Sequence, residues 1–90
     1  MGTTGLKKIL LVDDDREVSQ SLANLFDSDK YSFEFLEDGD GVRAYLKEND
    51  SVDLVMLDVN LPTLSGLEVL KQIREVQRMH RGLKLNLLTK

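Results

Sequence analysis

The sequence predicts an α/β fold, a doubly wound parallel sheet with crossover helices, from two observations. Residues 9–12 and 54–57 form apolar runs of four residues without polar alternation, as expected for strands buried on both faces. Segments with helical or alternating periodicity lie between and after these runs, which gives the order βαβαβαβ. With 90 residues, the chain is predicted to form a single domain over residues 1–90.

The first helix is predicted over residues 16–28. Asp15 is placed to cap its amino end, and Glu17 suits the positive end of the helix dipole. Its inward face is predicted from apolar residues at helical spacing, namely Val18, Leu22, Leu25 and Phe26.

A second strand and a second helix follow. Aromatic residues alternate with polar ones over residues 32–36, which predicts the strand. The loop at residues 38–41, which contains two glycines, leads into a helix. The apolar positions of this helix repeat at i, i+3 and i+4 and are Val42, Tyr45 and Leu46.

The last helix and strand come after the second apolar run. A loop at residues 60–66 precedes a helix that is predicted to end near Met79, and Ser65 and Glu68 are spaced like a capping box. The residues expected to face inward on this helix are Leu67, Leu70, Ile73 and Val76. Residues 83–88 are predicted to form the fourth strand, although Asn86 weakens its apolar pattern.

The composition excludes several classes of protein. A net charge of -4 and scattered basic residues argue against direct nucleic-acid binding by this segment. The chain has no cysteine, so it has neither disulfides nor thiolate metal sites. Its longest apolar run is far too short to span a membrane, and a cytoplasmic location is expected.

Aspartates follow both apolar runs. The first run ends at Asp13 and Asp14, the second at Asp58. Because parallel strands place their carboxyl ends at one edge of the sheet, these three carboxylates are expected to share a pocket if the two strands are neighbours. Such carboxylates repel one another, and a bound Mg²⁺ would remove that penalty while one of them acts as a nucleophile. The main-chain carbonyl of Asn60 could also face the ion.

Aspartates after strands are also common as helix caps and turn formers. That structural role is preferred for Asp15, and for Asp13 and Asp14 alone the two interpretations would be balanced. Asp58 at the end of the other run favours a functional pocket. Asp53 precedes its strand and is expected to be structural, at the opposite edge of the sheet.

These segments resemble the receiver domain of bacterial two-component response regulators. Residues 11–15 (LVDDD) and 53–66 (DLVMLDVNLPTLSG) carry the likeness, in which Asp58 is followed by Pro62 and Gly66. The resemblance extends over essentially the whole chain. It implies that Asp58 accepts a phosphoryl group from a histidine kinase or phosphotransfer protein.

The resemblance also implies roles for the residues around Asp58. Asp13 and Asp14 would hold Mg²⁺ together with Asp58, and the carbonyl of Asn60 would be a further ligand. Thr89 would hydrogen-bond the phosphoryl group, although a hydroxyl residue is also common at a strand end. The domain would be a phosphoacceptor and not an enzyme.

The chain departs from this family at its carboxyl end. Receivers that resemble it continue through a fourth helix, a fifth strand and a fifth helix, in the flavodoxin-like strand order 2-1-3-4-5. The resemblance therefore implies the order 2-1-3-4 and a domain that lacks its C-terminal portion, including a lysine that pairs with the phosphoryl group. Lys90 directly follows Thr89 and is not assumed to replace that lysine.

This departure has consequences for both the structure and the function that are expected. Right-handed crossovers leave one helix to cover one face of the sheet, so the 90-residue form is expected to dimerise, swap elements or be a shortened form of a longer protein. An alternative function is a phosphorylation-independent interaction or dimerisation module derived from a receiver.

A phosphatase-like hydrolase is disfavoured. Such enzymes place a second aspartate, which acts as an acid, at the position that Asn60 occupies here.

Overall fold

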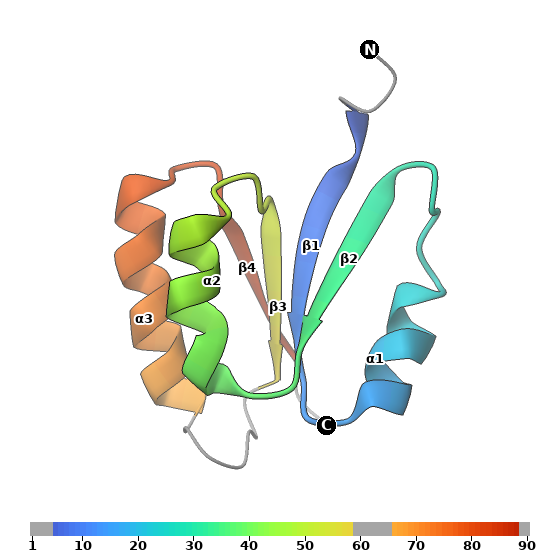
Figure 1. The fold of residues 1–90 in the computed structure, drawn as a ribbon, viewed down its shortest axis with the longest axis horizontal. Helices are drawn as coiled ribbons and strands as arrows, with labels where there is room; N and C mark the ends of the chain where they lie inside the picture. Colours follow the sequence, from blue (N-terminus) through green and yellow to red (C-terminus); the bar gives the residue numbers. More distant parts are fainter. Residues whose placement is uncertain (1–4, 59–65, 89–90) are drawn as a thin grey trace.

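A computed structural model describes residues 5–58 and 66–88 of the chain. The elements in order are β1 (Lys7–Val12), α1 (Arg16–Ala23), β2 (Tyr31–Leu36), η2 (Gly39–Gly41), α2 (Val42–Glu48), β3 (Leu54–Asp58), α3 (Gly66–Met79) and β4 (Lys84–Leu88). Apart from the short 3-10 turn η2, this is the predicted βαβαβαβ order (Figure 1).

All four strands are parallel, in the order β2-β1-β3-β4. The two apolar runs are the central pair, with Val12 beside Leu57 in the register of β1 and β3. Most of their side chains are buried because helices and neighbouring strands cover them on both sides. The expected strand order and the expected buried runs are therefore confirmed.

Helices α2 and α3 cover one face of the sheet (Figure 1). Leu10, Val55 and Leu57 from the central strands meet Leu46 of α2 and Ile73 of α3 in the larger of two apolar clusters. All five side chains are at most 1% exposed. This cluster is the main core and holds the two crossover helices against the sheet.

On the other face, α1 is the one helix in the part of the chain that the structure describes. Its Leu22 packs with Ile9, Leu11 and Met56 in the second apolar cluster. The expected asymmetry between the two faces is confirmed.

An aromatic group secures the end of α1 to β2. The ring of Phe26 lies 5.2 Å from the rings of both Tyr31 and Phe33, in edge-to-face geometry. To reach them, the chain leaves the helical path after Ala23, and Phe26 donates its backbone N–H to the Ala23 carbonyl in a three-residue step. Helix α1 therefore ends at Ala23, and the prediction of a helix to residue 28 was too long.

Two predicted helix faces need correction. On α1, Leu22 faces the sheet as expected, but Val18 is 40% exposed and Leu25 is 81% exposed. On α3, Leu67 was expected to face inward but is 65% exposed, whereas Val69, which was not predicted to do so, is fully buried in the core.

The amino edge of the sheet is organised by Asp53, as expected for a structural residue. Its carboxylate accepts a hydrogen bond of 2.8 Å from the Lys8 backbone N–H. Its own backbone N–H donates to the Lys8 carbonyl, and its carbonyl accepts from Lys84. Asp53 thus links β1, β3 and β4 where the strands begin.

Within the described ranges, every helix is too short or too polar to cross a lipid bilayer.

Candidate functional site

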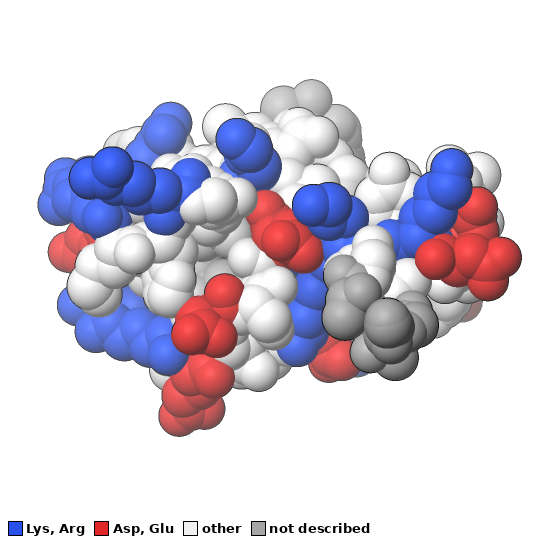
Figure 2. Space-filling view, turned by 90° about the horizontal axis from the view of Figure 1, so that it is seen from above, with Lys and Arg blue, Asp and Glu red and all other residues white. Residues whose placement is uncertain are grey.

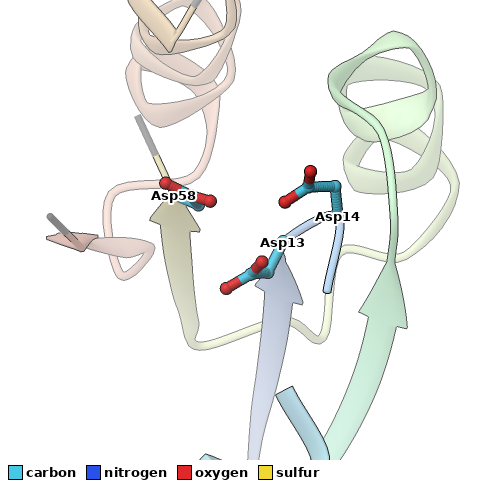
Figure 3. A group of neighbouring side chains, drawn as sticks. All are labelled: Asp13, Asp14 and Asp58. Atoms are coloured by element: carbon cyan, nitrogen blue, oxygen red, sulfur yellow. The ribbon is translucent and has the colours of Figure 1, made fainter. Parts of the chain in front are cut away.

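Three aspartates converge at the carboxyl edge of the sheet. One carboxylate oxygen from each of Asp13, Asp14 and Asp58 lies within 4.8 Å of the other two. Figure 3 shows the Asp14 and Asp58 side chains pointing toward one another, with Asp13 beside them. Asp13 is 2% exposed and Asp58 is 1% exposed, whereas Asp14 lies at the surface. The predicted meeting of acids distant in sequence is confirmed.

The convergence follows from the pairing of the central strands. Because Val12 lies beside Leu57, the residues that follow them, Asp13 and Asp58, lie at the same level of the sheet. Asp13 is fixed there by its backbone N–H, which donates to the Leu36 carbonyl at 3.0 Å. Its side-chain Oδ1 accepts the Asp15 N–H at 2.9 Å, which turns the chain toward α1.

Asp15 has the structural role expected of it. Its Oδ1 accepts the backbone N–H groups of Glu17 at 3.0 Å and Val18 at 3.2 Å, so it is the N-cap of α1. Capping satisfies two donors that the first helical turn leaves without an intrahelical partner. The third aspartate of the LVDDD segment therefore positions the helix, and Asp13 and Asp14 remain with the site.

The donor set suits a hard divalent cation. Mg²⁺ prefers oxygen ligands at about 2.1 Å in an octahedron, which places opposite ligands about 4.2 Å apart. Adjacent ligands of the same octahedron are about 3.0 Å apart. The three oxygens lie within 4.8 Å of one another, so small side-chain rotations would bring them to octahedral spacing. Burying the Asp13 and Asp58 carboxylates is costly, and a bound cation would lower that cost. The exposed position of Asp14 leaves the site in contact with solvent.

The other predicted site residues are not placed. Asn60 and Thr89 lie outside the described residues, as do Pro62 and Ser65. Within the described ranges, no other Asp, Glu or His joins the three aspartates.

Comparisons with known proteins agree with this site. Residues 9–89 match the family model for the response regulator receiver domain. The transcriptional regulatory protein CpxR of Klebsiella pneumoniae is 41% identical over 73 residues, which cover 81% of this chain and 31% of that protein. The response regulator MprA of a Mycobacterium species is 47% identical over 68 residues, or 74% of this chain and 29% of that protein. The chain thus spans about a third of the length of these relatives.

Solved structures show the same fold. The complex of CheX and CheY with BeF3 and Mg²⁺ from Borrelia burgdorferi aligns with a TM-score of 0.78 at 19% identity, covering 99% of this chain and 71% of that one. The response regulator TrrA of Thermotoga maritima, in complex with Mg²⁺ and BeF, aligns with a TM-score of 0.73 at 31% identity, covering 93% and 70%. The sheet is therefore of the CheY-like, flavodoxin-like type.

The strand order, the acidic group at the carboxyl edge and the match over residues 9–89 all lead to one assignment. Receivers are phosphoacceptor domains of two-component signalling and not enzymes in the usual sense. This chain belongs to the response regulator receiver family.

Proposed function

We propose that this domain takes a phosphoryl group onto Asp58 from the phosphohistidine of a histidine kinase or phosphotransfer protein. The observation that carries the proposal is the approach of the Asp13, Asp14 and Asp58 oxygens to within 4.8 Å of one another. Three carboxylates this close repel one another, and a cation shared among them would remove that repulsion.

In the transfer, an oxygen of Asp58 attacks phosphorus. The bond between phosphorus and the histidine nitrogen breaks, its electron pair returns to the imidazole, and an acyl phosphate forms on the aspartate. A bound Mg²⁺ would neutralise charge on the phosphoryl oxygens. Asp13, Asp14 and Asp58, with the carbonyl of Asn60, are the proposed ligands.

The chain's own geometry prepares Asp58 for this role. Asp58 ends a buried strand, which fixes its backbone direction toward the sheet edge. Asp13 is held by its hydrogen bond from Asp15, so its second oxygen is kept in a defined place. Positioning of this kind lowers the entropy lost when donor and acceptor meet. We further propose that the Thr89 hydroxyl donates a hydrogen bond to the phosphoryl group.

Beryllofluoride, a phosphoryl mimic, tests the proposal directly. With Mg²⁺ present, it is expected to shift the amide NMR signals of residues 13–15 and 57–58 in the wild-type chain. Asp58→Asn should abolish these shifts, because the mimic needs the carboxylate oxygen. Equal shifts in wild type and Asp58→Asn would contradict phosphorylation at this residue.

In the family that this chain resembles, a later lysine pairs with the phosphoryl group, and Lys90 is not assumed to take that role in a polypeptide of these 90 residues. We therefore expect it to bind Mg²⁺ but to accept a phosphoryl group only slowly from phosphoramidate. Intact-mass spectrometry over time measures the rate, and peptide mapping assigns the site. Rapid, stoichiometric modification of Asp58 would refute this expectation.

A second function is favoured by a specific feature, the face of the sheet that α1 covers alone among the described helices. A phosphorylation-independent interaction module would associate through that face, as a homodimer or a swapped oligomer. Analytical ultracentrifugation would then show association that does not change with Mg²⁺ and beryllofluoride. In either function we propose a cytoplasmic domain that does not itself bind nucleic acid.

A further inference from the structure

The two parts of the chain carry opposite charge. Residues 1–40 contain ten acidic and four basic side chains, whereas residues 41–90 contain six acidic and eight basic ones. Figure 2 shows basic side chains gathered on the side of the molecule where α2 and α3 lie. A locally basic surface on a chain with a net charge of -4 requires an explanation.

The basic surface borders a groove between α2 and α3. Arg43 and Lys47 line it from one turn of α2, at i and i+4 spacing, and Glu75, Arg78 and Met79 line it from α3. The groove encloses about 340 Å³. Its floor includes Val76, which is 1% exposed. Side chains from both helices thus line the same groove.

One end of the groove is internally neutralised. Arg43 forms an ion pair of 3.3 Å with Glu75, and both side chains are about half exposed. One turn further along the helices, Lys47 and Arg78 line the groove together with Met79. Met79 is 66% exposed, although it is a large apolar side chain. The groove as a whole therefore has two more positive than negative charges, and an apolar side chain lies among them.

Helix dipoles account for part of this arrangement. Lys47 and Arg78 lie in the last turns of α2 and α3, where basic residues are stabilised. That effect explains the charges but gives no reason for an exposed methionine beside them. Flexible methionines next to charged rims are typical of surfaces that bind partner segments.

We propose that this groove docks an acidic, amphipathic segment of a partner protein. Two carboxylates about one helical turn apart would pair with Lys47 and Arg78, and an apolar side chain between them would cover Met79 and Val76. Lys47 and Arg78 lie in the last turns of α2 and α3, which end at the amino edge of the sheet, whereas the acidic site lies at the carboxyl edge (Figure 1). Docking is therefore independent of the proposed phosphorylation.

The test uses a fluorescein-labelled helical peptide of about 15 residues, with two glutamates at i and i+4 and a leucine at i+3. Fluorescence anisotropy measures its affinity for the full 90-residue chain without Mg²⁺. Lys47→Glu combined with Arg78→Glu is expected to weaken binding at least about tenfold, because two attractive charge pairs become repulsive. The milder pair Lys47→Gln with Arg78→Gln should weaken it less and keeps the test valid if the charge reversal unfolds the protein.

The matched control is Lys7→Glu combined with Lys30→Glu. These two lysines are exposed outside the groove, and the control makes the same change in net charge. It should alter the affinity by less than about twofold. Equal weakening by both charge-reversed pairs, or no saturable binding by the wild type, would overturn the proposal.

The apolar part of the proposal has its own test. Replacing the peptide leucine with alanine should weaken binding to the wild type about threefold or more but should matter less for Met79→Ala. An identical response of wild type and Met79→Ala to the peptide change would show that only charge is recognised. That outcome would overturn docking of an amphipathic segment.

Discussion

Replacing Asp58 with asparagine is predicted to stabilise the metal-free protein and to remove most of its stabilisation by Mg²⁺. Asp13 and Asp58 are 2% and 1% exposed, and their carboxylate oxygens lie within 4.8 Å of each other. For two unit charges at that distance, an effective dielectric constant of about 20 gives a repulsion of about 3.5 kcal/mol. Asparagine keeps nearly the same shape and one acceptor oxygen but removes this repulsion.

The net gain is expected to be smaller than the repulsion. Asparagine replaces one carboxylate oxygen with a donor, so interactions that this oxygen accepts are lost. A net stabilisation of about 1 kcal/mol remains, which corresponds to a rise in Tm of about 4–8 °C for a domain of this size. The sign is opposite to that of most substitutions at buried positions, which makes the prediction specific to crowded acids.

Magnesium should reverse the order of the two proteins. A ligand that binds only the folded state at 100 times its Kd adds about 2.7 kcal/mol of stability. The wild type should gain this amount and Asp58→Asn much less. As the Mg²⁺ concentration rises, the Tm of the wild type should therefore overtake that of Asp58→Asn. Thermal melts followed by circular dichroism, with and without MgCl2, measure both effects.

The control for this experiment is Asp29→Asn, which also removes one negative charge. Asp29 is exposed between α1 and β2 and is not one of the three site aspartates. Its Tm should stay within about 2 °C of the wild type in either condition. Equal melting of wild type and Asp58→Asn without metal, or equal responses of both to Mg²⁺, would refute the shared-cation site.

Three further predictions follow from the fold. Leu10→Ala, at a fully buried position, should lower the free energy of unfolding by about 2–5 kcal/mol, whereas Leu25→Ala, at a leucine that is 81% exposed, should change it by less than about 0.5 kcal/mol in urea titrations. Asp15→Ala should cost about 1 kcal/mol through loss of the N-cap, and a variant as stable as the wild type would show that the cap contributes nothing. Asp53→Ala should cost about 1–3 kcal/mol by leaving the Lys8 N–H without its acceptor, and unchanged hydrogen exchange at the Lys8 amide would contradict this.

The sheet and the acidic site could be predicted because both depend on local sequence. A four-residue apolar run bounded by aspartate indicates a strand buried on both sides, as observed for β1 and β3. Once two such strands are parallel neighbours, the residues after them must meet at one edge. The neighbour relation itself did not follow from periodicity and came from the resemblance of the motif segments to a known family.

The helix faces were less predictable, for a geometric reason. Residues spaced by three turn about 300° around a helix, so each step falls about 60° short of a full turn. Over the three steps from Leu67 to Val76 the drift is about 180°, and one face cannot contain both. The structure buries Val76 and leaves Leu67 exposed. The end of α1 was unpredictable for another reason, since it is set by the contact of Phe26 with the rings of Tyr31 and Phe33 on β2.

The separation of the acidic and basic surfaces follows from the same topology. In a sheet of parallel strands with crossover helices, each helix runs back toward the start of the strands, so helix N-termini lie at the carboxyl edge and helix C-termini lie at the amino edge. Acidic residues are favoured near the former, as Asp15 is, and basic residues near the latter, as Lys47 and Arg78 are. Helix α1 begins directly after Asp13, Asp14 and its N-cap Asp15, and the positive end of its dipole favours carboxylates near its first turn. A change at the basic groove can therefore alter partner docking without disturbing the electrostatics of the three aspartates, and the two sites can be tested separately.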